Sequence, residues 1–173
     1  ELGISHGISP ESVERALLKY PDAKAVLVIN PTYFGFVADL KRIVDIVHAR
    51  NIPVIVDEAH GVHIKFHDDL PLSAMQAGAD MAATSTHKLG GSMTGSSVLN
   101  VREGLVSAKR VQSVFSMLTT TSTSYPMLAS IDTARRQLAV NGQNLLDDAI
   151  RLARDARKRI NSIPHLHCVG REK

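Results

Sequence analysis

The sequence predicts an α/β fold with a mostly parallel sheet, flanking helices and one antiparallel strand. Apolar runs at residues 25–30, 54–57 and 80–85 alternate with segments whose apolar residues recur at helical spacing. This alternation is typical of parallel strands joined by right-handed crossover helices. A fourth apolar run, residues 96–101, follows the third after too few residues for a crossover helix. We therefore expect it to return as an antiparallel strand.

Two helices and two strands are expected in the first third of the chain. Ser9 and Pro10 form a helix start, with the serine as cap and the proline at the first helical position. The continuous apolar run 25–30 is typical of a strand that is covered on both faces. Residues 36–50 carry apolar side chains at helical spacing. We expect this segment to be the crossover helix that leads to the strand at 54–57.

Helices dominate the later part of the chain. A short helical segment at residues 70–79 leads to the strand at 80–85, and the region from about 103 to 161 is expected to be helical. Two sets of apolar residues share helical faces in this region. The first set is Met127, Ile131, Ala134 and Leu138, and the second is Leu145, Ala149, Leu152 and Ala156.

Composition is that of a globular domain. The 173 residues are 44% apolar and 21% charged, and no apolar run approaches the roughly 18 residues of a membrane span. Cys168 is the single cysteine, so we expect a reducing, cytoplasmic setting. The basic stretch at residues 151–160 follows acidic residues on an expected helix, which is typical of a solvated face. Neither a membrane nor a nucleic-acid partner is expected.

The stretch "IPVIVDEAHGVH", residues 52–63, raises the question of what Asp57 does. Its Asp-Glu-Ala-His is also the spelling of a helicase Walker B box, in which the aspartate holds magnesium. That ATPase needs a preceding glycine-rich loop that ends in Gly-Lys-Ser/Thr. No such loop precedes Asp57, and "THKLGGSMTGSS" places its glycines after the lysine. The ATPase hypothesis is weakened but stays open.

A metal site is the second hypothesis for this region. His60, His63 and His67 would share one face of a helix. However, apolar and polar residues alternate over 62–67, which is an extended pattern, and Gly61 interrupts any helix. Cysteine ligands and an evident fourth ligand are also lacking. We therefore expect His63 and His67 to lie on a solvated edge, and no metal site.

The third hypothesis pairs Asp57 with Lys88. Each follows a strand, and neighbouring parallel strands would bring their ends to one edge, about 5 to 10 Å apart. A lysine amine that is partly desolvated can react with an aldehyde. A nearby carboxylate can keep the pyridine nitrogen of pyridoxal phosphate protonated. Ser85, Thr86 and His87 beside the lysine would supply donors to the phosphate.

Four segments together resemble a known family: "NPTYFG", "VDEAHG", "DLPLSAMQAGADM" and "STHKLGGSMTGSS". They are similar to the pyridoxal-phosphate domain of bacterial arginine/lysine/ornithine decarboxylases, which have the aspartate-aminotransferase fold, type I. The resemblance implies that Lys88 carries pyridoxal 5'-phosphate covalently, and that Ser85 and His87 contact its phosphate. It also implies that Asp57 pairs with the pyridine nitrogen and that Ala59 packs on the ring face.

His60 is expected near the cofactor and is counted with Lys88 and Asp57 among the catalytic residues, without an assigned role. The resemblance implies decarboxylation of a basic amino acid to an amine and carbon dioxide, feeding polyamine synthesis. Arginine is favoured, and lysine and ornithine stay open. Alternatives are an aminotransferase or other lyase on the same fold, or a non-catalytic truncated fragment.

Family members are much longer than this chain and have active sites at a dimer interface. The resemblance therefore implies a homodimer or higher oligomer, in which the polar run "TTTSTSYP" reaches the partner's cofactor. Helix capping by Ser122 or Ser124 is the alternative role for that run. We expect residues 1–161 to be part of the cofactor-binding major domain. Residues 162–173, with an apolar alternation typical of a strand, are expected to begin the C-terminal small domain.

Overall fold

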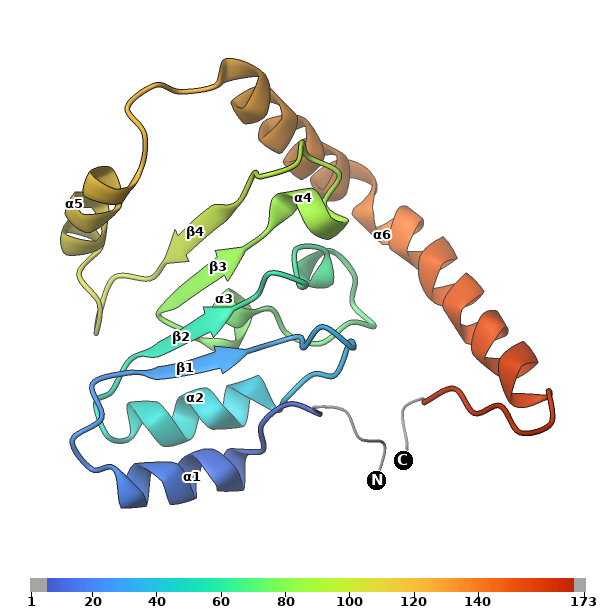
Figure 1. The fold of residues 1–173 in the computed structure, drawn as a ribbon, viewed down its shortest axis with the longest axis horizontal. Coiled ribbons are helices and arrows are strands. Elements are labelled where there is room, and N and C mark those ends of the chain that lie inside the picture. The colour runs from blue at the N-terminus through green and yellow to red at the C-terminus, as the bar shows by residue number, and fades with distance from the viewer. Residues whose placement is uncertain (1–5, 170–173) are drawn as a thin grey trace.

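The computed structural model describes residues 6–169, which form a four-stranded sheet with helices around it (Figure 1). The strands are β1 (Val26–Ile29), β2 (Val54–Asp57), β3 (Met81–Thr84) and β4 (Val98–Val101), and they lie in this order across the sheet. β1, β2 and β3 are parallel, whereas β4 is antiparallel to β3. The predicted fold class is confirmed, including the antiparallel return of the fourth strand.

The register places the ends of the three parallel strands at one edge of the sheet. Ile29 pairs with Asp57, and Asp57 pairs with Ala83. The segments that follow these residues therefore all leave from the same edge, which we call the carboxyl edge. The connections after β1, β2 and β3 carry the residues that the sequence singled out.

Two helices cover one face of the sheet, α1 (Pro10–Lys19) and α2 (Leu40–His48) (Figure 1). Ser9 caps α1 as predicted, because its side chain accepts the backbone N–H of Ser12. Asp39 caps α2 in the same way, so this helix begins later than the predicted residue 36. The core between sheet and helices is apolar, and its fully buried side chains include Ile43, Val44, Val47, Val54 and Val56.

The opposite face of the sheet is open in the part of the chain that the structure describes. Val28 of β1 is buried in the core, but Leu27 and Ile29 are 68% and 56% exposed. The prediction that this strand is covered on both faces is therefore wrong for residues 6–169. The physical reason is that side chains alternate along a strand and α1 and α2 supply an apolar layer on one side only.

The segment between β2 and β3 contains a 3-10 helix, η1 (Ile64–Phe66), and a short helix, α3 (Ala74–Ala77). The extended pattern predicted for residues 62–67 is therefore wrong. α3 has a capping box formed by Ser73 and Gln76, and it ends at Gly78 with a φ of 101°. That helix end agrees with the prediction.

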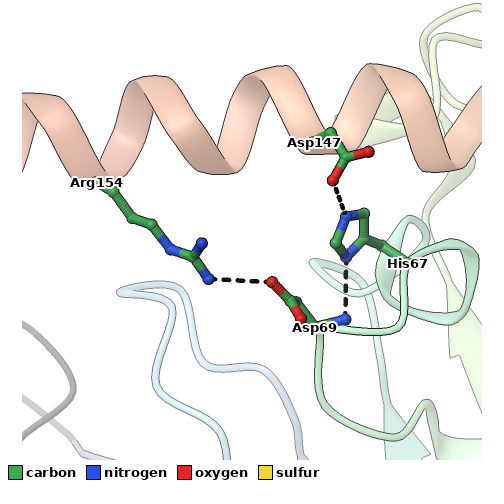
Figure 2. Close-up of polar contacts among 4 residues, drawn as sticks. All are labelled: His67, Asp69, Asp147 and Arg154. Carbon is green, nitrogen blue, oxygen red and sulfur yellow. Dashed lines mark hydrogen bonds and ion pairs between the residues drawn. The ribbon is translucent and has the colours of Figure 1, made fainter.

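His67 is buried, so the prediction of a solvated edge is wrong for it. Its Nε2 lies 2.8 Å from Oδ1 of Asp147 on the long helix α6 (Tyr125–Asn161), as Figure 2 shows. The backbone N–H of Asp69 donates to its Nδ1 at 3.0 Å. Because Nδ1 accepts, the neutral ring carries its proton on Nε2 and donates to Asp147. An ion pair between Arg154 and Asp69, at 3.1 Å, adds a second link to α6.

His63 also departs from the solvated-edge prediction. Its ring is half-buried, and Nδ1 is buried with no hydrogen-bond partner among the described residues. Burial lowers the pKa of His63, because the surroundings disfavour the charged ring. The three histidines that follow Asp57 therefore occupy three different environments.

The region predicted to be helical is divided into two helices, α5 (Ala108–Leu118) and α6. On α6, Ala134 is buried and Met127, Ile131 and Leu138 are half-buried, so the first predicted face is confirmed. The second predicted face is exposed: Leu145 is 47% and Leu152 is 59% exposed. The physical reason is visible in Figure 1, where the end of α6 extends away from the sheet.

The chain beyond α6 has no strand up to residue 169, and the remainder of the predicted strand lies outside the described residues. The division into domains at residue 161 stays a prediction. None of the helices in residues 6–169 combines the length and the apolarity that crossing a membrane requires.

Gly142 lies where α6 comes close to η1. A Cβ added at this residue would lie 2.9 Å from Cβ of Phe66, which is closer than packed carbon atoms come. The backbone of α6 therefore lies directly against Phe66, and only a glycine leaves room for this contact.

We expect Gly142→Ala to lower the free energy of unfolding by about 1–3 kcal/mol through overpacking. In an open helical position the same change would instead gain about 1 kcal/mol. Asn141→Ala is the matched control, because Asn141 is exposed on the same helix. Urea unfolding of both variants measures the difference, and equal stability of the two would contradict the close contact.

Candidate active site

Asp57 is the last residue of β2, and its carboxylate shapes the turn that follows. The backbone N–H of Ala59 donates to Oδ1 of Asp57 at 3.0 Å, which is an Asx-type turn. The N–H of Gly61 then donates to the carbonyl of Glu58 at 2.9 Å. A Cβ at residue 61 would lie 2.5 Å from Cγ of Glu58. This tight turn leaves Asp57, Ala59 and His60 partly exposed at the carboxyl edge.

Glu58 points away from that edge into the interior. Its Oε1 accepts the backbone N–H of Ala74 at 2.6 Å, and its Oε2 accepts the hydroxyl of Thr84 at 3.4 Å. Burial raises the pKa of Glu58, although these two hydrogen bonds oppose the shift. The carboxyl thus ties the end of β2 to the end of β3 and to the start of α3.

The residues Ser85, His87 and Lys88 lie directly after β3. Ser85 is the N-cap residue of α4 (Thr86–Leu89), but its side chain makes no capping hydrogen bond. Nδ1 of His87 lies 2.7 Å from the carbonyl oxygen of Ser96. Because a carbonyl only accepts, Nδ1 is the donor, and Nε2 is the nitrogen left for another partner. Lys88 is exposed at the same edge.

Ser96 is the hub that holds α4 in place. It is 1% exposed, and its hydroxyl lies 3.0 Å from the hydroxyl of Thr86 and 2.5 Å from that of Ser92. It also donates to the carbonyl of Met93 at 2.7 Å. The loop after Lys88 therefore folds back under α4 and fixes the direction in which His87 and Lys88 project.

Lys88 and His60 meet across the carboxyl edge. Nζ of Lys88 lies 3.2 Å from Nε2 of His60. The ring of Tyr33, from the segment after β1, packs edge-on against the His60 ring with centroids 5.6 Å apart and planes at 90°. Residues from three successive strand ends are thus in one chain of contacts.

A carboxylate, an amine and hydrogen-bond donors lie together at the carboxyl edge. Asp57 has no ion-pair partner within residues 6–169. Its carboxylate is therefore available to a cationic ligand group, and Lys88 presents a primary amine nearby. In that same part of the chain, no three His, Cys, Asp or Glu side chains gather as metal ligands would. These groups at the carboxyl edge suit a ligand that has both a carbonyl group and a basic ring nitrogen. The amine can react with the carbonyl, and the carboxylate can pair with the protonated nitrogen.

Comparison with known proteins agrees with this chemistry. Residues 1–172 match the family model described as "Orn/Lys/Arg decarboxylase, major domain". The chain belongs to the Orn/Lys/Arg decarboxylase family. An arginine decarboxylase of Halalkalibacterium halodurans is 69% identical over 171 residues, which are 99% of this chain and 35% of that relative. The chain thus spans about a third of the length of this curated relative.

Solved structures show the same fold. Pyridoxamine-pyruvate aminotransferase from Mesorhizobium loti has a TM-score of 0.70 at 18% identity, over 91% of this chain and 44% of that one. The constitutive lysine decarboxylase of E. coli has a TM-score of 0.67 at 23% identity, over 87% of this chain and 22% of that one. The predicted family resemblance and the predicted fold are both confirmed.

The residues that the sequence singled out, Asp57, Ala59, His60, Ser85, His87 and Lys88, all lie at or near the carboxyl edge. Three residues that organise this edge were not singled out from the sequence. Tyr33 lies in "NPTYFG" directly after β1, so its place at a strand end was a usable signal. Glu58 is a neighbour of Asp57, and the alternation of side chains along a strand would have directed it inward. Ser96 gave no signal, because its role arises only when the loop after Lys88 folds back.

Glu58→Gln tests the buried carboxyl. Because its folded-state pKa is raised, the stability that protonated Glu58 contributes is complete below the ordinary glutamate pKa. It is lost as pH rises through the raised value. Glutamine keeps the acceptor for Ala74 and carries no charge. We therefore expect the variant to gain stability relative to the unmodified protein as pH rises above the ordinary glutamate pKa, by about 1.4 kcal/mol per unit of pKa shift.

The measurement is urea unfolding of both proteins at a series of pH values that begins below the ordinary glutamate pKa. A stability difference that does not change with pH would show that the Glu58 carboxyl pays no penalty for burial.

Proposed function

We propose that this chain is part of a pyridoxal-phosphate-dependent decarboxylase that acts on arginine. The observation that carries the proposal is the placement of Asp57 at the end of β2 and of Lys88 on α4, just after the adjoining parallel strand β3, within a decarboxylase family. The name of the relative, arginine decarboxylase, supports arginine over lysine and ornithine as substrate. Release of an amine and carbon dioxide would feed polyamine synthesis.

The residues of the carboxyl edge fit pyridoxal 5'-phosphate in their donor set. Asp57 has a carboxylate oxygen beyond the one that accepts from Ala59, which suits a protonated ring nitrogen. The Ser85 hydroxyl and Nε2 of His87 are engaged by no other group in the described part of the chain, which suits a phosphate. Ala59, next to Asp57, is small enough to lie against a flat ring.

Each residue then has a defined task. Lys88 supplies the amine that holds the cofactor covalently, and Asp57 holds a proton at the ring nitrogen. Ser85 donates a hydrogen bond to the phosphate, and His87, when protonated, donates from Nε2 while Nδ1 stays bound to Ser96. When bound, pyridoxal phosphate supplies an electron sink for the electron pair left behind by departing carbon dioxide.

Assembly and location complete the proposal. We propose a homodimer or higher oligomer in which the run "TTTSTSYP", residues 119–126, contacts a second copy. Two observations support this: these residues are all exposed, and Ser124 begins α6 without a capping bond from its side chain, which weakens the capping alternative. A single cysteine in the chain agrees with a cytoplasmic location.

Lys88→Ala tests cofactor attachment in the full-length protein. We expect the unmodified protein, mixed with pyridoxal phosphate, to gain a visible absorption band that borohydride removes, because a carbon–nitrogen double bond forms at Lys88. Peptide mass mapping after borohydride would place the reduced cofactor on Lys88. Lys65→Ala is the control, since Lys65 is an exposed lysine on η1. A band that persists in Lys88→Ala would overturn the assignment of the lysine.

Carbon dioxide release from arginine, lysine and ornithine by the full-length protein tests the reaction. We expect the largest kcat/KM with arginine and a fall of at least about 10³-fold in Asp57→Asn, because the ring nitrogen would lose its ionic partner. Production of a keto acid without carbon dioxide would instead support the aminotransferase alternative. Inactivity of a protein that still binds the cofactor at Lys88 would support a non-catalytic role.

A further inference from the structure

The contact between His60 and Lys88 has a direction that chemistry imposes. An ammonium group has three donors and no acceptor, so Lys88 donates and Nε2 of His60 accepts at 3.2 Å. The neutral ring that accepts at Nε2 carries its own proton on Nδ1. His60 therefore presents a basic lone pair to the one nitrogen that has to lose a proton before it can react.

We propose that His60 is the proton acceptor that converts Lys88 from an ammonium to a reactive amine during cofactor loading. This proposal rests on the proposed function, in which Lys88 binds pyridoxal phosphate. The proton moves along the existing hydrogen bond: the N–H bond of Lys88 breaks, its electron pair stays on Nζ, and the proton bonds to Nε2 of His60. The free amine then condenses with the cofactor aldehyde, and the carbonyl oxygen leaves as water with the two remaining amine protons.

The fold holds His60 for this task from two sides. The Asx turn of Asp57 sets the backbone that leads to His60. The edge-on ring of Tyr33 restricts the imidazole from the side of β1. Tyr33 and Lys88 are the titratable groups that contact His60 in the described part of the chain, and Asp57 and Glu58 precede it in the same turn. Tyr33 is thus a positioning residue for His60.

Proximity makes the histidine useful. A free lysine amine is scarce at neutral pH, whereas an imidazole is a base that titrates between about pH 5 and 8. A base already in hydrogen-bond contact takes up the proton without a separate encounter with solvent, and such positioned bases contribute about 10²–10⁴-fold to rates. The consequence is a loading rate that depends on the basicity of residue 60 and not only on its contact with Lys88.

His60→Gln in the full-length apoenzyme separates basicity from contact. Glutamine keeps an acceptor oxygen for Lys88 but cannot take up the proton. Mixing with pyridoxal phosphate, followed by the visible band and by borohydride trapping at Lys88, measures the loading rate and the final yield. We expect the same final yield, with loading at least about tenfold slower near neutral pH.

The pH profile adds a readout that a purely structural role would not change. Loading of the unmodified protein is expected to stay fast at pH values below those that His60→Gln requires. Loading of His60→Gln is expected to rise only at alkaline pH, where lysine amines lose their proton unaided. Added imidazole is expected to accelerate loading of His60→Ala. His167→Gln is the matched control at an exposed histidine and is expected to load like the unmodified protein.

Three results would contradict either the role of His60 or the proposed function. An unchanged rate and pH profile in His60→Gln would overturn the proposal. Failure of His60→Gln to load even at alkaline pH would also overturn it, because the ring contact and not proton uptake would then be essential. Absence of a Lys88-dependent band in the unmodified protein would refute the proposed function itself.

Discussion

The parallel register of β1, β2 and β3 is the constraint on which the site depends. Ile29, Asp57 and Ala83 are paired side by side, so the segments after them all leave from one edge. Tyr33, His60 and Lys88 are far apart in sequence and come together because each lies a few residues beyond a strand end. A slip of one residue in the register would turn each strand's side chains to the other face and would separate these groups.

Adjacent residues of the Asp-Glu-Ala-His segment point into different environments. Asp57 faces the open edge and Glu58 faces the interior, because successive side chains near a strand end point to opposite sides. The buried carboxyl of Glu58 bonds to Ala74 and Thr84, which fixes the spacing of β2, β3 and α3. Ser96 does the same for α4 from the other side. The candidate site residues at the carboxyl edge are therefore held in place by two buried polar side chains, Glu58 and Ser96.

The open face of the sheet and the exposed end of α6 both carry apolar side chains. Within residues 6–169, Leu27 and Ile29 on β1 and Leu145 and Leu152 on α6 are apolar side chains that stay exposed. An apolar pattern in the sequence predicts that a face is buried, but it does not tell which element covers that face. The chain spans about a third of the length of its curated relative.

The sequence by itself indicated the four strands, most of the helices and the candidate site residues. Apolar periodicity located the four strands, and local capping at Ser9 and Gly78 located helix ends. The position of Asp57 at the end of one strand and of Lys88 shortly after the next indicated the edge of the sheet at which both lie. These features depend on residues close together in the chain, so they can be recognised without coordinates.

Only the tertiary structure decided the environments of the three histidines. His60 contacts Lys88, His63 is half-buried without a partner for Nδ1, and His67 is buried against Asp147. Their partners lie up to 80 residues away in sequence, and long-range packing, not local pattern, determines which of them meets a lysine, a carboxylate or no polar partner.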